Sequence, residues 1–335
     1  MGFLGSYIRN LGSIAMDRQP LRPLLFSYYL THRCDLNCAY CCDGDGKRFK
    51  TAPIPELSTA QAKQLIGILR RAASTLDLTG GEPMLRMDLE EIMSHARSLG
   101  FRTVLNTKGI GLEQRPDLMR LADVLVLSLD TLRAESLAAL LGRPAPVAER
   151  VLSAMRFAIA RRHETGARIV LSAVATPENL DEVAGVLRFA VDNGVGFHVS
   201  PEIVGTRPNP ALRENARYRR LLDDVLEAKR TARGVFGVRS YLKGIRDFGS
   251  FPCHPLLMPV IRPDGKMYYP CLESKQAEMD LLEAGDYDKA LGVARARLGE
   301  VPKCRDCCHI FCHMALSLYQ RRPLEALGEL KHWRR

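Results

Sequence analysis

Short apolar runs alternate with longer amphipathic stretches between about residues 24 and 200. Runs of branched and aromatic residues bounded by turn-forming residues predict strands. We expect these strands at Leu24–Leu30, Leu76–Thr79, Arg102–Leu105, Val124–Leu129, Arg168–Ala173 and Gly196–Val199. Helical spacing of apolar positions predicts helices at Thr59–Arg71, Leu89–Leu99, Asp117–Leu121, Val147–His163 and Leu180–Asp192. Six successive β/α units predict an α/β fold, in which a parallel sheet carries helices on its outside.

The pattern changes after Ser200. Pro201, Pro208 and Pro210 interrupt the chain, and a charged amphipathic helix is expected from about Leu212 to Arg230. Further on, the Pro-Asp-Gly sequence at 263–265 lies between β-favouring residues and predicts a hairpin. The sequence therefore indicates a large α/β unit followed by a smaller one.

Three cysteines, Cys34, Cys38 and Cys41, lie within eight residues in a C-x3-C-x2-C pattern. Thiolates this close can hold three irons of a 4Fe-4S cluster and leave the fourth iron open to a small molecule. Composition alone would produce such a match with a probability on the order of one per cent. A zinc site or a disulfide is the alternative, but neither explains the Gly80-Gly81-Glu82-Pro83 motif some forty residues later.

The cysteine pattern and the glycine motif after Leu76-Asp77-Leu78-Thr79 together resemble the radical S-adenosylmethionine (radical SAM) superfamily. In that family, SAM chelates the open iron, and one electron cleaves it to methionine and a 5'-deoxyadenosyl radical that abstracts hydrogen. The resemblance implies a partial (β/α)6 TIM-like barrel. It also places the catalytic groups at the carboxyl ends of the strands, where these motifs fall.

The same resemblance implies roles for the cofactor-binding residues. Gly80 and Gly81 would let the backbone approach a ligand closely, and Glu82, which precedes Pro83, would accept hydrogen bonds from the SAM ammonium. Tyr40 is expected against the adenine. Asn106, Ser128 and Asp130 are expected at the ribose and the methionine carboxylate, although each could also be an ordinary strand-end cap.

A second cysteine group comprises Cys253, Cys271, Cys304 and Cys307. The predicted hairpin would bring Cys253 and Cys271 together at its open end. This half resembles the twitch domain, a shortened SPASM extension that binds an auxiliary 4Fe-4S cluster. The doublet Cys307-Cys308 leaves the fourth ligand open, and a structural zinc site is the alternative. Because the cysteines that remain, Cys42, Cys308 and Cys312, are too few for another cluster, we expect one auxiliary cluster.

These features predict five segments. They are an N-terminal amphipathic segment (1–22), a radical SAM core barrel (23–205), a helical linker (206–250), a twitch/SPASM-like auxiliary cluster domain with a β-hairpin and helices (251–320), and a basic tail (321–335). The apolar face of the first segment either packs on the barrel or rests on a membrane as a peripheral contact.

The composition, 46% hydrophobic and 26% charged over 335 residues, is ordinary for a soluble protein. Ten cysteines without a recognisable signal peptide indicate metal ligands in a reducing, cytoplasmic setting. The net charge of +10 is spread over helices without aromatic interleaving, so no nucleic-acid partner is expected, although an anionic substrate could be attracted.

The function expected is a radical SAM oxidoreductase that abstracts hydrogen from a small-molecule or lipid-like substrate. It would need an external one-electron reductant of the flavodoxin or ferredoxin type. If the auxiliary cluster accepts an electron, the outcome is oxidation; if Cys308 or Cys312 returns hydrogen, the outcome is epimerisation. A peptide-modifying enzyme of the RiPP-maturation type is an alternative, although only 33 residues precede Cys34. A non-catalytic iron-sulfur scaffold protein is the alternative of another class.

Overall fold

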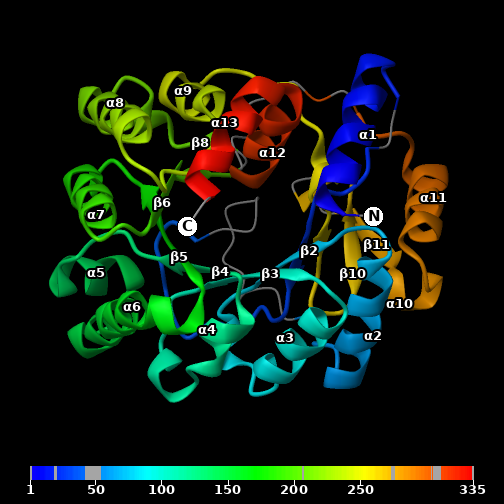
Figure 1. Cartoon of the computed structure of the whole chain (residues 1–335), viewed down its shortest axis with the longest axis horizontal. Helices are drawn as coiled ribbons and strands as arrows, with labels where there is room; N and C mark the ends of the chain where they lie inside the picture. Colours follow the sequence, from blue (N-terminus) through cyan, green and yellow to red (C-terminus); the bar gives the residue numbers. More distant parts are fainter. Residues whose placement is uncertain are drawn as a thin grey trace.

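A computed structural model describes residues 2–18, 21–41, 54–205, 207–272, 276–302, 304 and 311–333. Six parallel strands form its centre and confirm the predicted α/β class (Figure 1). They are β1 (Phe26–Tyr29), β2 (Thr75–Thr79), β3 (Arg102–Thr107), β4 (Val124–Ser128), β5 (Arg168–Ala175) and β6 (Gly196–Pro201). These strands pair in sequence order, as expected for successive β/α units.

Helices cover the outer face of the sheet, as Figure 1 shows. They are α2 (Thr59–Arg70), α3 (Leu89–Ser98), α4 (Asp117–Leu121), α5 (Ala134–Leu141), α6 (Ala145–Thr165) and α7 (Leu180–Asp192). Of these helices, only α5 was not predicted. Strand β2 shows how the sheet separates its faces: Leu76 and Leu78 are fully buried, whereas Asp77 between them lies on the opposite, inner face.

The predicted hairpin is present and continues this sheet. Strand β9 (Val260–Ile261) pairs in parallel with β1, and β10 (Lys266–Tyr269) pairs antiparallel with β9 and with β11 (Gln276–Asp280). At the turn, the Arg262 N–H donates to the Lys266 carbonyl at 2.8 Å, and Gly265 has a φ of 82°, which favours glycine. The nine-stranded sheet therefore has the order β11-β10-β9-β1-β2-β3-β4-β5-β6.

The remaining elements surround the open side of the barrel. They are α1 (Phe3–Ala15), the short pair β7 (Ile203–Val204) and β8 (Arg207–Pro208), α8 (Ala216–Thr231), α9 (Arg239–Asp247), α10 (Leu281–Ala284), α11 (Tyr287–Leu298), α12 (Phe311–Arg321) and α13 (Pro323–Trp333). Single 3-10 turns occur at Pro83–Leu85, Leu112–Gln114, Pro210–Leu212 and Pro255–Leu257. No helix in the described part of the chain is both long and apolar enough to cross a bilayer.

The N-terminal helix α1 packs on α12. The Tyr7 hydroxyl donates to the Tyr319 carbonyl at 3.0 Å, and the two rings are 5.4 Å apart in an edge-to-face arrangement. The Gln320 amide donates to the Tyr7 carbonyl at 3.0 Å. Leu4 and Ile8 stay 68% and 59% exposed. The predicted amphipathic face is thus covered along one side only.

Candidate active site

The cysteine motif lies on the loop that follows β1. Cys38 is buried, and Cys34 and Cys41 are half-buried. A turn closes the motif, since the Cys41 N–H donates to the Cys38 carbonyl at 3.1 Å. Burial raises the pKa of the Cys34 and Cys38 thiols, and the positive charge of Lys108 acts against that rise in pKa at Cys38. A positive group therefore lies close enough to favour a thiolate.

The glycine motif after β2 packs directly on this loop. The Gly81 N–H donates to the Thr31 carbonyl at 2.7 Å, and the Glu82 N–H donates to the Arg33 carbonyl at 2.9 Å. A Cβ atom on Gly80 would lie 2.3 Å from the Thr31 oxygen, and one on Gly81 would lie 2.3 Å from the Arg33 oxygen. Glycine is needed at both positions because the backbone of the cysteine loop lies there. From the sequence, we expected these glycines to let the backbone approach a ligand. In the structure, they let it approach the cysteine loop.

An ion-pair network fixes the beginning of the same loop. Glu56 accepts hydrogen bonds from the Thr31 hydroxyl and from Arg33 Nε, the latter at 2.7 Å. The buried Arg86 donates to the Leu30 carbonyl at 3.2 Å and is held by Asp88. The loop is thereby attached to the segment after β2 by side chains as well as by backbone.

Glu82 is buried, with 3% of its surface exposed. Its carboxylate accepts hydrogen bonds from the Thr107 hydroxyl (2.6 Å), the Lys108 N–H (2.9 Å) and the Met84 N–H (3.0 Å). Burial raises the pKa of Glu82, and these hydrogen bonds oppose the rise. Because a carboxylate offers about four acceptor positions, Glu82 can still accept one more hydrogen bond.

Tyr40, Lys108 and Asp130 form a buried group where β3 and β4 end. The Tyr40 hydroxyl donates to Asp130, and Lys108 Nζ lies 3.2 Å from the Asp130 carboxylate and 3.4 Å from the Tyr40 hydroxyl. The Val174 N–H also donates to Asp130 at 2.9 Å. Burial acts to lower the pKa of Lys108, but the charges of Asp130 and Cys38 hold it above its usual range. The predicted residues Tyr40 and Asp130 thus contact each other, and both contact Lys108, which was not predicted from the sequence.

The position of Lys108 in the sequence could have identified it as a candidate site residue. It follows β3 by one residue, at the carboxyl end of a parallel strand, which is where binding groups gather in such sheets.

Asn106 and Asp77 interact on the inner face of the sheet. The Asn106 amide donates to Asp77, which also accepts a hydrogen bond from the Ser27 hydroxyl at 3.0 Å. Burial raises the pKa of Asp77 to about 6, although both hydrogen bonds act to lower it. Ser128, at the end of β4, is half-buried and lies in register with Ser172 on β5. The predicted ribose and carboxylate contacts of Asn106 and Ser128 stay predictions.

Two cysteines of the second group lie side by side. The Cys253 N–H donates to the Cys304 carbonyl at 3.0 Å, and Cys271 follows β10 by two residues. Cys307 and Cys308, like Cys42, lie outside the described residues. Across the described residues, no three Cys, His, Asp or Glu side chains converge closely enough to enclose a metal ion. The donor chemistry nonetheless fits iron-sulfur clusters, since thiols are their usual ligands.

Cys312 lies on α12 and is half-buried. It packs with Tyr29 against an apolar cluster formed by Met258, Val260 and Leu272. Burial raises the pKa of the Cys312 thiol to about 12, and the charge of Asp77 acts in the same direction. The charges of Cys312, Asp77 and Cys41 all act on the pKa of Tyr29, which is raised chiefly by burial. Tyr29 therefore lies near both Cys312 and Cys41.

Residues 28–190 match the family model described as the radical SAM superfamily. This segment of the chain belongs to that superfamily. The radical SAM domain so defined contains the cysteine loop, the glycine motif and the Tyr40–Lys108–Asp130 group. It begins within β1 and ends within α7.

Solved structures share the fold beyond the radical SAM domain. SuiB from Streptococcus suis, bound to its precursor peptide SuiA, matches with a TM-score of 0.62 at 18% identity, covering 90% of this chain and 80% of SuiB. SuiB bound to S-adenosylmethionine matches with a TM-score of 0.61, also at 18% identity, covering 86% and 69% of the two chains. HydG, a maturase of the FeFe-hydrogenase, matches with a TM-score of 0.51 at 13% identity, covering 96% and 74%. The likeness to SuiB covers 90% of this chain and so extends past the residues that match the family model.

Proposed function

We propose that this chain is a radical SAM enzyme that abstracts hydrogen from its substrate, with Cys34, Cys38 and Cys41 as the ligands of a 4Fe-4S cluster. When bound, the cluster and SAM supply a one-electron cleavage that yields the 5'-deoxyadenosyl radical. The observation that carries the proposal is the direct junction between the cysteine loop and the glycine motif. At this junction the loop that carries the three cysteines contacts the segment that carries the buried Glu82.

The residues around this junction are arranged to bind and orient SAM. Glu82 is held by three donors and can accept a hydrogen bond from an ammonium group. The Tyr40 ring is fixed through its hydroxyl by Asp130, so an aromatic face is available for adenine. Lys108 balances the charge of Asp130 and lies where a carboxylate or a cysteine thiolate would be stabilised.

For hydrogen return, and with it epimerisation, the proposed donor is Cys312 or Cys308, of which Cys312 lies in the described part of the chain. A thiol with a pKa of about 12 stays protonated at neutral pH and so carries a transferable hydrogen. In that step the S–H bond of Cys312 breaks and a C–H bond forms on the substrate radical. The sulfur radical left behind takes one electron from the external reductant and one proton from solvent. Oxidation is the competing outcome, and it requires an electron acceptor.

For that acceptor we propose an auxiliary 4Fe-4S cluster with Cys253, Cys271, Cys304 and either Cys307 or Cys308 as ligands. The hydrogen bond between Cys253 and Cys304 supports this assignment, because it holds two of the four residues together. The segment 251–320 would then be a twitch/SPASM-like domain, next to the barrel at 23–205 and the linker at 206–250.

A small-molecule or lipid-like substrate remains our first proposal, and a peptide is the second candidate. The peptide is favoured by one observation: the SuiB structure that covers 90% of this chain contains the precursor peptide SuiA. A flavodoxin- or ferredoxin-type protein would supply electrons to either enzyme. We propose a cytoplasmic location, where such reductants operate.

The decisive test is SAM cleavage by the anaerobically reconstituted protein with dithionite as reductant, read as 5'-deoxyadenosine by mass spectrometry. We expect product from the wild type and from Cys42→Ala, which removes a neighbouring thiol outside the motif. We expect none from the Cys34/Cys38/Cys41→Ala triple variant. Absence of product from the wild type would instead favour the non-catalytic scaffold.

Iron and sulfide analysis of the same triple variant tests the second cluster. Retention of about four irons would support the auxiliary cluster. Loss of all iron would refute it and leave the second cysteine group as zinc ligands or free thiols.

A further inference from the structure

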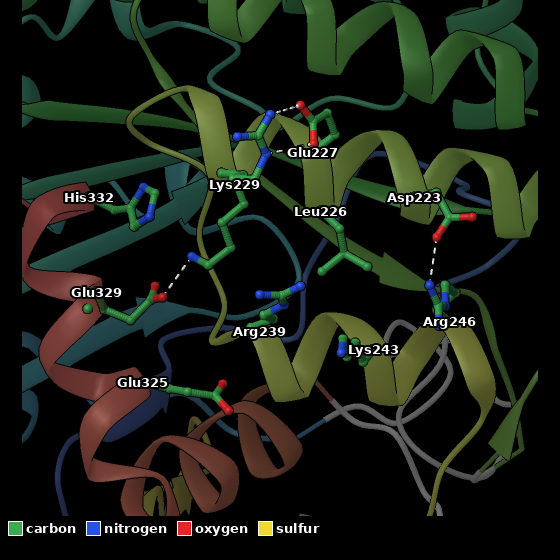
Figure 2. Close-up of a pocket in the computed structure, with 12 residues that line it drawn as sticks. Asp223, Leu226, Glu227, Lys229, Arg239, Lys243, Arg246, Glu325, Glu329 and His332 are labelled. Atoms are coloured by element: carbon green, nitrogen blue, oxygen red, sulfur yellow. Dashed lines mark hydrogen bonds and ion pairs between the residues drawn. The ribbon is translucent and has the colours of Figure 1, made fainter.

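A charged cleft opens between α8, α9 and α13, as Figure 2 shows. Its volume is about 560 Å³, within the range of pockets that hold small molecules. Its lining includes no residue of the cysteine loop or the glycine motif. The cleft is therefore separate from the candidate active site.

Most charges that line the cleft neutralise one another. Arg246 pairs with Asp223 at 2.7 Å, and Arg230 pairs with Glu227 at 2.7 Å. Lys229 pairs with Glu329 at 2.7 Å, and both side chains are about nine-tenths buried. Glu325 accepts a hydrogen bond from the Ser240 N–H at 2.7 Å, next to the start of α9.

Arg239 and Lys243 are the exception. They lie four residues apart on α9 and so share one face of that helix, where like charges repel. Figure 2 shows Arg239 directed from α9 into the cleft, with Lys243 one turn further along. Within the described part of the chain, neither side chain has a recorded hydrogen bond or ion pair. Neither cation thus makes an ion pair with the described residues of the cleft, although the charge of Lys243 helps Arg246 to lower the pKa of Asp247.

We propose that this cleft binds a small anionic metabolite, whose phosphate or carboxylate group is held between Arg239 and Lys243. A guanidinium group can bind either anion through two parallel hydrogen bonds, and a nearby ammonium adds a third donor. The carboxylates of Asp223, Glu227 and Glu329 flank the two cations and would repel an extended polyanion. A compact anion fits this charge pattern better than a nucleic acid does.

Isothermal titration of the reconstituted full-length protein with pyrophosphate and with citrate tests the proposal. The ionic strength is matched with sodium chloride so that general screening is the same in each titration. We expect the wild type to bind at least one probe. The Arg239→Gln/Lys243→Gln variant should bind that probe with an affinity lower by about tenfold or more. Binding of pyrophosphate alone would identify a phosphate ligand, and binding of citrate alone would identify a carboxylate ligand.

Arg150→Gln/Arg156→Gln is the matched control, because it removes the same two charges from exposed positions on α6. We expect it to keep the wild-type affinity within about twofold. The proposal is overturned if the wild type binds neither probe at millimolar concentration, or if the control weakens binding as much as the cleft variant. Melting temperatures without ligand verify that both variants are folded.

Discussion

Replacing Gly81 by alanine should separate the cysteine loop from the glycine motif. The added Cβ would lie 2.3 Å from the Arg33 oxygen, 2.7 Å from the Arg33 carbonyl carbon and 2.8 Å from the His32 oxygen. All three atoms belong to the backbone, so rotation of a side chain cannot relieve the overlap. The loop would have to move by about 1 Å to restore an ordinary van der Waals contact.

That movement would weaken the two hydrogen bonds between Gly81 and Thr31 and between Glu82 and Arg33. Each contributes about 1 kcal/mol net, and overpacking adds about 1–3 kcal/mol. We therefore expect Gly81→Ala to lower the free energy of unfolding by about 3–5 kcal/mol. Urea denaturation of the reduced apo protein under anaerobic conditions measures this directly, and iron content after reconstitution reports the damage to the cluster site.

Gly67→Ala is the matched control. Gly67 lies within α2, and a Cβ there would meet nothing within 4 Å. Alanine favours a helix over glycine by up to about 1 kcal/mol, so this variant should be neutral or more stable. A Gly81→Ala protein within about 1 kcal/mol of the wild type, with normal iron content, would refute the steric reasoning.

Three further predictions follow from buried groups. Lys108→Met should destabilise the protein by about 3 kcal/mol in urea denaturation, because it leaves the buried Asp130 carboxylate without its cation. Asp77→Asn should gain stability relative to the wild type as pH rises from about 4 to about 6. The native state holds a proton on Asp77 up to a pKa of about 6, whereas the usual pKa of an aspartate is 3.8. The wild type therefore loses stability across that window as pH rises. Cys312 should react with iodoacetamide at pH 8 far more slowly than free cysteine, because a pKa of about 12 leaves very little thiolate.

Each of these has a result that would contradict it. Lys63→Met breaks an exposed pair with Glu91 and should cost less than about 1 kcal/mol, so an equal loss for both lysine variants would count against burial as the cause. A pH-independent difference between Asp77→Asn and the wild type would show that the carboxyl group titrates normally. Alkylation of Cys312 within tenfold of the free-cysteine rate, read by peptide mass spectrometry, would show an exposed thiol.

Much of the fold was predictable because its signals are local. Alternation of apolar runs located all six parallel strands, and Pro-Asp-Gly located the hairpin between β9 and β10. The pairing of β9 with β1 was not predicted, since it joins residues more than two hundred positions apart and depends on how the sheet curves. No pattern in the sequence specifies that register.

The sequence named part of the candidate site, and the roles of those residues stay predictions. Tyr40 and Asp130 followed from the family resemblance, but nothing along the chain indicated that they hydrogen-bond to each other. Lys108 and Asp77 were missed because their roles come from burial and from neighbours on adjacent strands. A charged residue at a strand end has no distinguishing mark until those neighbours are known.

The parallel pairing of β1 with β9 also determines what a shortened protein would do. Strand β1 carries Phe26 and Tyr28, both fully buried, and it ends where the cysteine loop begins. Without residues 251–271, one side of β1 would become an open edge whose unpaired N–H and C=O groups invite association with other chains. Excision of residues 23–205, the segment predicted to form the barrel, should therefore give aggregation instead of a soluble fragment. The second half of the chain covers the strand that leads into the first cysteine motif.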